Sequence, residues 1–249
     1  MKQGFTDIHT HILPSVDDGA QGVEDALELL RLEKQKGVER VRLTPHFYPQ
    51  AETLTDFLAR RNGAYTALMT RWEEGAMPQL QLGAEVHYSP ELVEMELEQL
   101  TLGVGKYLLL ELPVDECPIC IEQVIDRIRR KGIIPILAHV ERCTYFRHQP
   151  ELLLRLIQAG ALGQISARAL PDKKDRSFGE SCIKNGLGHI VASDLHSKTG
   201  KDLCLNAPAE RGYKELMDWT ESFAMAVWNN ASIPPFAVRP VRRNILDYR

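Results

Sequence analysis

The sequence predicts an α/β fold, in particular a distorted, seven-stranded (β/α) barrel of the TIM type, with an open doubly wound sheet as the alternative. Three observations lead to this prediction. Short apolar runs alternate with amphipathic helical patterns along almost the whole chain, glycines follow most of the helical patterns, and about seven strand units can be counted. Strands separated by helices pair in parallel through right-handed crossovers. A complete TIM barrel has eight units, so seven indicate a distorted or incomplete one.

The expected strands are short apolar runs at residues 5–8, 41–44, 80–84, 107–110, 133–138, 162–165 and 190–192. The helical patterns between and after them occupy residues 23–36, 54–74, 90–98, 121–131, 150–159 and 214–228. Four of these helices stop at glycines, which readily take the left-handed conformation that follows a last helical turn: Gly37, Gly75, Gly132 and Gly160.

The composition changes at about residue 229, where a tail rich in proline and arginine begins. Up to that point the chain shows no fixed-period repeat and no low-complexity tract. We therefore expect one domain of residues 1–230 and a C-terminal extension, residues 231–249, that packs on or beside it.

The bulk composition is that of a globular protein, with 249 residues of which 44% are hydrophobic and 26% charged. The formal net charge of -4 gives no electrostatic reason to expect a nucleic-acid partner. The first residues lack the apolar segment of a signal peptide, and no window approaches the roughly 18 apolar residues that span a bilayer. We expect a cytoplasmic protein without membrane insertion, and five cysteines, an odd number, argue against a disulfide framework.

Histidines and carboxylates stand where the expected strands end. In parallel α/β folds these ends share one face, and six of the seven strands deliver a ligand-type residue to it. His9 and His11, two apart on an extended segment, point the same way. Any one such residue has an ordinary structural explanation, but together they are costly to bury without a cation. The candidate metal ligands are His9, His11, Asp18, His46, Glu85, Glu111, His139, Asp194 and His196.

The charge of such a site indicates its substrate. Four carboxylates contribute -4, and nine ligands suffice for three divalent ions, so the loaded site would carry about +2. A site of that charge attracts a phosphate dianion, and water bound to it can ionise near pH 7. Two cationic side chains, Arg142 and Lys201, follow ligand histidines closely enough to reach the same face and hold phosphoryl oxygens. We expect a metal-dependent phosphoester hydrolase that a chelator inactivates.

Other classes of protein are less consistent with this pattern. A cysteine-nucleophile tyrosine phosphatase needs Cys-x5-Arg, and no cysteine here has an arginine six positions later. The segment Cys117-Pro118-Ile119-Cys120 follows a strand and opens a helix, as a thioredoxin-like redox site would. A non-catalytic docking module is the third alternative, with tail arginines touching an acidic partner: Arg239, Arg242 and Arg243.

These motifs resemble the polymerase and histidinol phosphatase (PHP) superfamily, and most closely its bacterial manganese-dependent protein-tyrosine phosphatases, which are encoded with capsular and exopolysaccharide genes. The segment 11–20, HILPSVDDGA, is especially similar, and the resemblance covers residues 5–230. It is carried by residues 9–11 with Asp18 and by segments 44–46, 83–85, 111–113, 138–142 and 193–196. It implies the PHP fold, a distorted TIM-like barrel.

The resemblance also implies three ions, manganese in the first place, with iron or zinc possible. The first ion would be held by His9, His11, Glu85 and Asp194, the second by Glu85, Glu111 and His139, and the third by Asp18, His46 and His196. Because all nine positions are filled, the resemblance implies an active enzyme.

The implied reaction is hydrolysis of phosphotyrosine in one step, on a bacterial autophosphorylating tyrosine kinase of polysaccharide export. Arg142 matches the family's phosphate-binding arginine, and Asp194 or His196 is expected to supply a proton to the leaving group. Two positions depart from the family pattern: Lys201 replaces an arginine, and Ser166 replaces an asparagine. A histidinol phosphate phosphatase, or another small phosphomonoester phosphatase of the superfamily, is the alternative enzyme.

Overall fold

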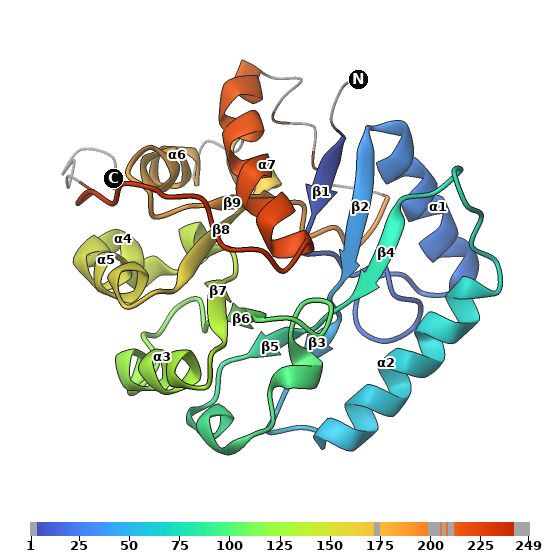
Figure 1. Ribbon diagram of the computed structural model, residues 1–249, viewed down its shortest axis with the longest axis horizontal. Helices are drawn as coiled ribbons and strands as arrows, with labels where there is room; N and C mark the ends of the chain where they lie inside the picture. Colours follow the sequence, from blue (N-terminus) through green and yellow to red (C-terminus); the bar gives the residue numbers. More distant parts are fainter. Residues whose placement is uncertain (1–3, 172–174, 199–204, 206–207, 209–211, 242–249) are drawn as a thin grey trace.

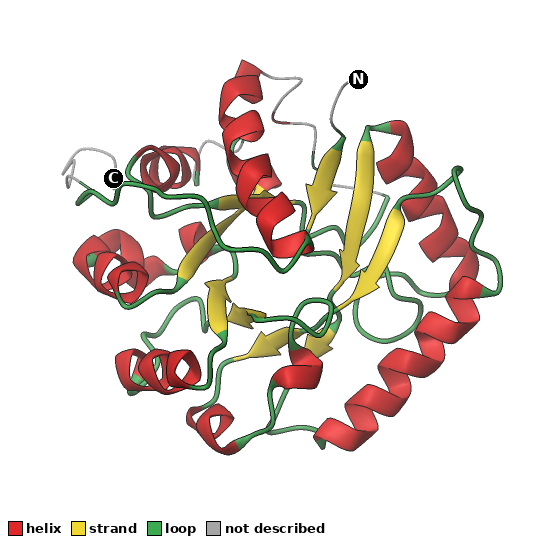
Figure 2. Cartoon of the chain, in the orientation of Figure 1, coloured by secondary structure: helices red, strands yellow, loops and turns green. Residues whose placement is uncertain are grey.

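The computed structural model describes residues 4–171, 175–198, 205, 208 and 212–241 (Figure 1). Strands lie on the inside and helices on the outside, in an α/β arrangement whose strand layer curls (Figure 2). Every strand pairing is parallel, in the orders β1-β2-β4 and β3-β5-β6-β7-β8-β9. The strands are β1 (Phe5–Asp7), β2 (Val38–Leu43), β3 (His46–Phe47), β4 (Gln79–Leu82), β5 (Glu85–His87), β6 (Tyr107–Glu111), β7 (Ile134–Leu137), β8 (Leu162–Ser166) and β9 (Ile190–Ala192).

The helices agree with the expected order but not in every boundary. They are α1 (Val23–Gln35), α2 (Leu54–Met69), α3 (Ile121–Arg130), α4 (Thr144–His148), α5 (Pro150–Gln158), α6 (Arg176–Lys184) and α7 (Lys214–Trp228). α2 ends five residues before the expected position 74. The sequence analysis did not identify α4 and α6 as helices.

The expected helix at residues 90–98 is wrong as an α-helix. Two 3-10 turns occupy this region, η1 (Pro90–Glu94) and η2 (Glu98–Leu100). Met95 separates them because its backbone is extended, with ψ of 154°. Two further 3-10 turns, η3 (Val140–Arg142) and η4 (Ala167–Ala169), follow β7 and β8.

Two of the expected strands, at residues 41–44 and 80–84, are each followed by a second short strand that was not expected. β2 and β3 are separated at Pro45, which has no N–H for a sheet hydrogen bond. β4 and β5 are separated at Gly83, where a Cβ atom would lie 2.6 Å from Leu102 Cδ2. The second segment of each strand begins with a candidate ligand, His46 or Glu85, so the breaks set the direction of these side chains.

The first and last strands approach each other at their carboxyl ends. The N–H of Asp194 donates to the carbonyl of His9, and the N–H of His11 donates to that of Leu195, each at 2.9 Å. These bonds and a parallel bridge between Thr10 and Leu195 bring the segments that follow β1 and β9 side by side.

Two apolar clusters support this arrangement. The larger lies between the strands and the helices, and the smaller fills the inside of the curl below the carboxyl ends, with Ile8, Leu109 and Ile136 fully buried in it. The described part of the C-terminal tail packs on the same body, with the Phe236 ring 4.3 Å from that of His189. Among the described residues, no helix combines the length and apolarity needed to cross a membrane.

Candidate metal centre

The nine candidate ligands all lie at the carboxyl ends of the strands. Most of them border a cavity of about 540 Å³ at this end. The cavity is lined by Asp18, His46, Tyr48, Glu85, Glu111, His139, Arg142, Arg168, Asp194, His196 and Ser197. His9 and His11 lie beneath it and are fully buried. The structure therefore brings together residues that the sequence distributes over almost 190 positions.

The most compact group consists of His9, His11, Glu85 and Asp194, one donor atom of each lying within 4.8 Å of the others. The Nε2 atoms of both histidines are 3.0 to 3.1 Å from Glu85 Oε2 and 3.4 Å from Asp194 Oδ1. The two Nε2 atoms are 3.2 Å apart. This is the group expected to hold the first ion.

Neighbouring acceptors fix the orientation of these imidazoles. His9 Nδ1 lies 3.2 Å from Gln164 Oε1, an oxygen that also accepts the N–H of His139. His11 Nδ1 lies 2.7 Å from the carboxylate of Asp17. Each Nδ1 faces an acceptor and so carries a proton, which leaves Nε2 as the nitrogen of each ring that could bind a metal ion.

A cation fits this geometry. Two imidazole lone pairs 3.2 Å apart repel each other unless a cation or a proton lies between them. Imidazole and carboxylate donors suit manganese, iron and zinc. The residues present therefore fit a divalent ion at His9, His11, Glu85 and Asp194.

The remaining ligands extend the cluster on two sides. His139 Nε2 lies 3.2 Å from Glu85 Oε1 and 3.8 Å from Glu111 Oε1, but the compact group around these two carboxylates contains His46 in place of His139. His46 Nδ1 is also close to both carboxylates, at 3.2 and 3.6 Å, so His46 stands between the second and third groups. Glu85 lies close to His9 and His11 of the first group, to His139 of the second and to His46 of the third.

The third expected group is the most open. Asp18 Oδ1 lies 3.8 Å from His46 Nε2 and 3.4 Å from His196 Nε2. The side chain of Asp18 is 72% exposed, whereas His9, His11 and Glu85 are fully buried. The ring of His11 stacks on that of His196 at 4.0 Å and so joins this group to the first.

The ionisation of the buried groups reflects their crowding. Burial raises the pKa of Glu85, but the surrounding histidines outweigh it and hold this pKa well below its ordinary value. Burial lowers the pKa of His9 and His11, and the carboxylates outweigh it and raise both. Without an ion, the site thus retains protons on its imidazoles, and a metal would compete with those protons.

Arg142 is an expected cationic residue that reaches this cluster. Its Nη2 pairs with Asp194 Oδ2 and lies 3.4 Å from Ser166 Oγ. Burial lowers the pKa of Arg142, and Asp194 and Glu141 outweigh it, so the pKa is raised. The guanidinium side chain is 20% exposed and lines the cavity. The residue departing from the family pattern, Ser166, is therefore next to the expected phosphate-binding arginine.

Lys201 lies outside the described residues, as do Arg242 and Arg243 of the tail. Three residues that the sequence analysis did not assign to the site are part of it. Asp17 orients His11 and also accepts the N–H of His46, while Tyr48 and Arg168 line the cavity. The only sequence signal for Asp17 was its position next to the candidate ligand Asp18. Nothing in the sequence indicated Tyr48 or Arg168.

The four cysteines in the described part of the chain do not have the features of a thioredoxin-like redox centre. Cys117 and Cys120 are free and exposed just before α3. Burial and, after it, Glu122 raise the pKa of Cys117, whereas a redox-active thiol has a lowered pKa. Cys143 and Cys182 are buried, and burial raises the pKa of Cys143 to about 12.

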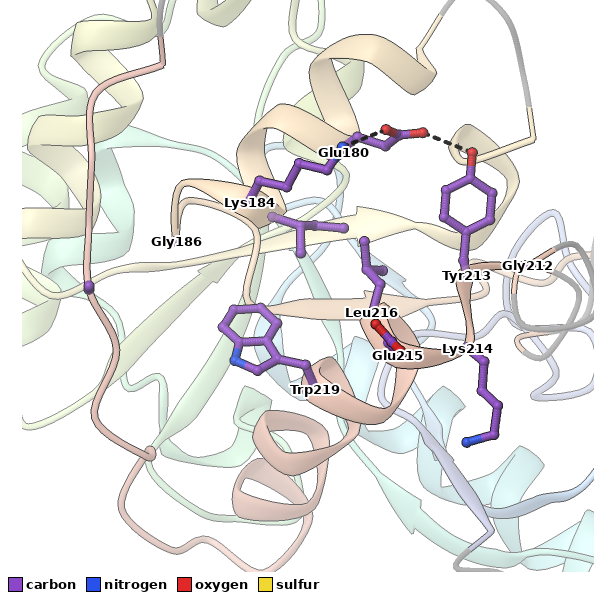
Figure 3. A pocket seen from close by; sticks show the side chains of 11 residues that line it. Glu180, Lys184, Gly186, Gly212, Tyr213, Lys214, Glu215, Leu216 and Trp219 are labelled. Carbon is purple, nitrogen blue, oxygen red and sulfur yellow. Dashed lines mark hydrogen bonds and ion pairs between the residues drawn. The ribbon is translucent and has the colours of Figure 1, made fainter.

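A larger cavity, about 800 Å³, lies between α6 and α7 (Figure 3). Glu180 accepts hydrogen bonds there from Tyr213 at 2.8 Å and from Lys184 at 3.0 Å. Its described lining residues include no histidine or cysteine. Metal and phosphoryl chemistry are therefore assigned to the cavity at the strand ends.

The chain is similar to a known protein family and to proteins described as tyrosine-protein phosphatases. The family model described as capsular polysaccharide synthesis, CpsB/CapC, matches residues 5–218. The chain is 34% identical over 197 residues to the tyrosine-protein phosphatase YwqE of Bacillus subtilis (strain 168), covering 77% of each chain. It is 31% identical over 207 residues to the putative tyrosine-protein phosphatase CapC of Staphylococcus aureus, covering 81% of this chain and 80% of the relative.

A solved structure is also similar. It comes from crystal structures of YwqE from Bacillus subtilis and CpsB from Streptococcus pneumoniae, described as unique metal-dependent tyrosine phosphatases. The TM-score is 0.84 at 27% sequence identity, covering 96% of this chain and 100% of the other. The similarity extends over the α/β fold and its curled parallel sheet.

Proposed function

Because the chain belongs to the CpsB/CapC family of capsular polysaccharide synthesis, we propose that it is a metal-dependent phosphatase that hydrolyses phosphotyrosine in proteins. One observation carries the proposal. Buried imidazoles and carboxylates converge at the strand ends, with Arg142 beside them in the same cavity. That arrangement has the donors for divalent ions and a guanidinium for the phosphoryl group.

When bound, divalent ions would neutralise charge on the phosphoryl oxygens and lower the pKa of water at the site. They would be held by the three groups named above, around Glu85. Arg142 donates to a phosphoryl oxygen, and Asp194 fixes the direction of its guanidinium through the ion pair. His9 and His11 keep their Nδ1 protons on Gln164 and Asp17, so their Nε2 atoms stay directed at the metal position.

The arrangement favours an aryl ester over an alkyl ester. Burial raises the pKa of Asp194, but His9, His11 and Arg142 outweigh it and hold the carboxylate ionised, so Asp194 has no proton to give. His196 directs its Nδ1 at the carbonyl of Asp194, 2.9 Å away. Of the two expected proton donors this leaves His196, whose Nε2 lies 3.4 Å from Asp18 Oδ1 in the cavity, and a phenol, with a pKa of about 10, needs such help least. This supports phosphotyrosine over histidinol phosphate.

We propose manganese, in three ions, as the cofactor and a bacterial autophosphorylating tyrosine kinase of polysaccharide export as the protein substrate, with the reaction in the cytoplasm. We further propose a seven-stranded TIM-like barrel over residues 1–230, with residues 231–249 as its extension. The backbone bonds between the segments after β1 and β9 support such a barrel.

The test is a steady-state assay of the purified chain with a phosphotyrosine peptide and with histidinol phosphate, each with manganese, iron, zinc or chelator. We expect hydrolysis of the peptide with a preference over histidinol phosphate, and none with chelator. Preference for histidinol phosphate would favour the alternative, a histidinol phosphate phosphatase. Activity that survives chelation would contradict a metal-dependent mechanism.

A further inference from the structure

Tyr48 is an aromatic residue at the mouth of the candidate site. It follows β3 directly, two residues after His46, and lines the same cavity as Arg142. Its side chain remains 39% exposed, which makes it one of the few large hydrophobic side chains that face solvent among the described residues. A ring exposed beside a reaction site is available to a ligand.

The position of this ring is fixed by two other rings. Tyr48 lies 5.3 Å from His46 with 30° between the ring planes, and 5.3 Å from His87 with 42° between them. His87 is held in turn by Glu111, whose Oε2 lies 3.2 Å from His87 Nδ1. The hydroxyl of Tyr48 has no hydrogen-bond partner in the described part of the chain, so ring contacts rather than polar ones locate it.

We propose that Tyr48, flanked by His87, is the surface on which the phenyl ring of the substrate packs while Arg142 holds the phosphoryl group. This inference rests on the proposed phosphatase function and adds the residue that selects an aromatic ester. The cavity of about 540 Å³ is of the size that accepts small ligands. An alkyl phosphate has no ring to pack there and gains nothing from Tyr48.

A purely structural role makes a different prediction. If Tyr48 only supported the imidazole of His46, its removal would disturb the metal cluster and would weaken the binding of all phosphate esters alike. Ring packing instead changes the affinity for aryl groups alone. Aromatic pairs contribute roughly 0.5–1.5 kcal/mol, so the expected loss is about 3- to 10-fold.

The experiment compares Tyr48→Ala, Tyr48→Phe and the wild type with metal bound. Inhibition constants are measured for phenylphosphonate and ethylphosphonate, which are not hydrolysed, together with kcat/KM for a phosphotyrosine peptide and the metal content. Trp219→Ala is the matched control, because Trp219 is 38% exposed but lies on α7 in the other cavity.

We expect Tyr48→Ala to raise the inhibition constant of phenylphosphonate and to lower kcat/KM for the peptide, each by about 3- to 10-fold. The inhibition constant of ethylphosphonate and the metal content should not change. Tyr48→Phe and Trp219→Ala should resemble the wild type. An equal loss for both phosphonates, or a loss of metal, would overturn the inference in favour of support for His46. No change for either phosphonate would overturn it as well, while leaving the phosphatase function intact. A wild-type chain that hydrolyses no aryl phosphate would refute both proposals.

Discussion

The guanidinium of Arg142 is paired with the carboxylate of Asp194, and this pair connects the cavity to the buried ligands. Asp194 Oδ2 accepts from Arg142, while Oδ1 lies 3.4 Å from the Nε2 atoms of both His9 and His11. The backbone of Asp194 has φ of 56°, an uncommon value for a residue with a side chain. One carboxylate thus contacts both the guanidinium that we propose for phosphate binding and the histidines that we propose for metal binding.

Replacing Arg142 should reduce catalysis more than binding of metal. We expect Arg142→Ala to lower kcat/KM for a phosphotyrosine peptide by roughly 10²- to 10³-fold, the usual cost of removing a donor to the transition state. Arg142→Lys should fall in between, because an ammonium is a single point charge. Arg130→Ala is the control, since Arg130 is exposed and, within the described ranges, forms an ion pair with Asp126 on the same helix. Equal rates for wild type and Arg142→Ala would exclude this role.

Metal should stabilise the chain as well as activate it. The clustered donors are favourable only with a cation between them, so chelation should lower the melting temperature. At a metal concentration of about 100 Kd the gain is about 2.7 kcal/mol. We expect His9→Ala to lose most of the stability gained from metal, as measured by urea unfolding with and without manganese. The variant should also lose activity. A melting temperature that does not respond to metal in the wild type would argue against the site.

Asp17 should control metal affinity without binding metal itself. Its carboxylate accepts from His11 Nδ1. Burial raises the pKa of Asp17, but His11 and the N–H groups of Gly19 and His46 together outweigh it and lower this pKa to about 2. Asp17→Asn replaces the charged acceptor of the His11 Nδ1 proton by a neutral amide, which orients and polarises the imidazole less strongly. We expect metal affinity to fall about 10- to 100-fold by titration calorimetry. Asp115→Asn, on an exposed carboxylate, should leave affinity unchanged.

Glu221 on α7 should make the fold less stable as pH rises. Burial raises the pKa of this carboxyl to about 7, although Thr6 and Arg40 oppose the rise. The folded chain therefore binds this proton more tightly than the unfolded chain does. The free energy of unfolding should fall between about pH 4.5 and pH 7, by roughly 3 kcal/mol, and level off above that.

Glu221→Gln should remove this part of the pH dependence. Urea unfolding of both proteins at several pH values, with the same free metal concentration, isolates the contribution, because Asp7 and the metal ligands titrate in both. Parallel curves for the two proteins would show that Glu221 ionises normally.

Much of the site could be predicted from sequence because of topology. His46, Glu85 and His139 each follow an apolar run, and parallel strands place such positions on one face whatever the details of the loops. The helices that escaped prediction, α4 and α6, are short or lie among loop residues, and their apolar faces become evident only against the rest of the fold. The region of residues 90–98 has a helical pattern, yet Met95 takes an extended conformation that no local pattern indicates.

The contacts that organise the ligands were harder to predict. Asp17 and Asp18 are adjacent in sequence, and only the folded loop shows that Asp17 points inward to His11 while Asp18 faces the cavity. Tyr48 resembles any surface tyrosine until its neighbours His46 and His87 are placed. Such roles depend on distances between segments, which the spacing of residues along the chain does not determine.

The pairing of the segments after β1 and β9 has a consequence for synthesis. His9 and His11 leave the ribosome early, but Asp194, which completes their group, is made about 180 residues later. A nascent chain therefore displays an incomplete set of ligands during most of its translation. For the ion that we propose at this group, all four donors are available only after the segment that follows β9 has emerged, so we expect metal loading to come late in the synthesis of each molecule.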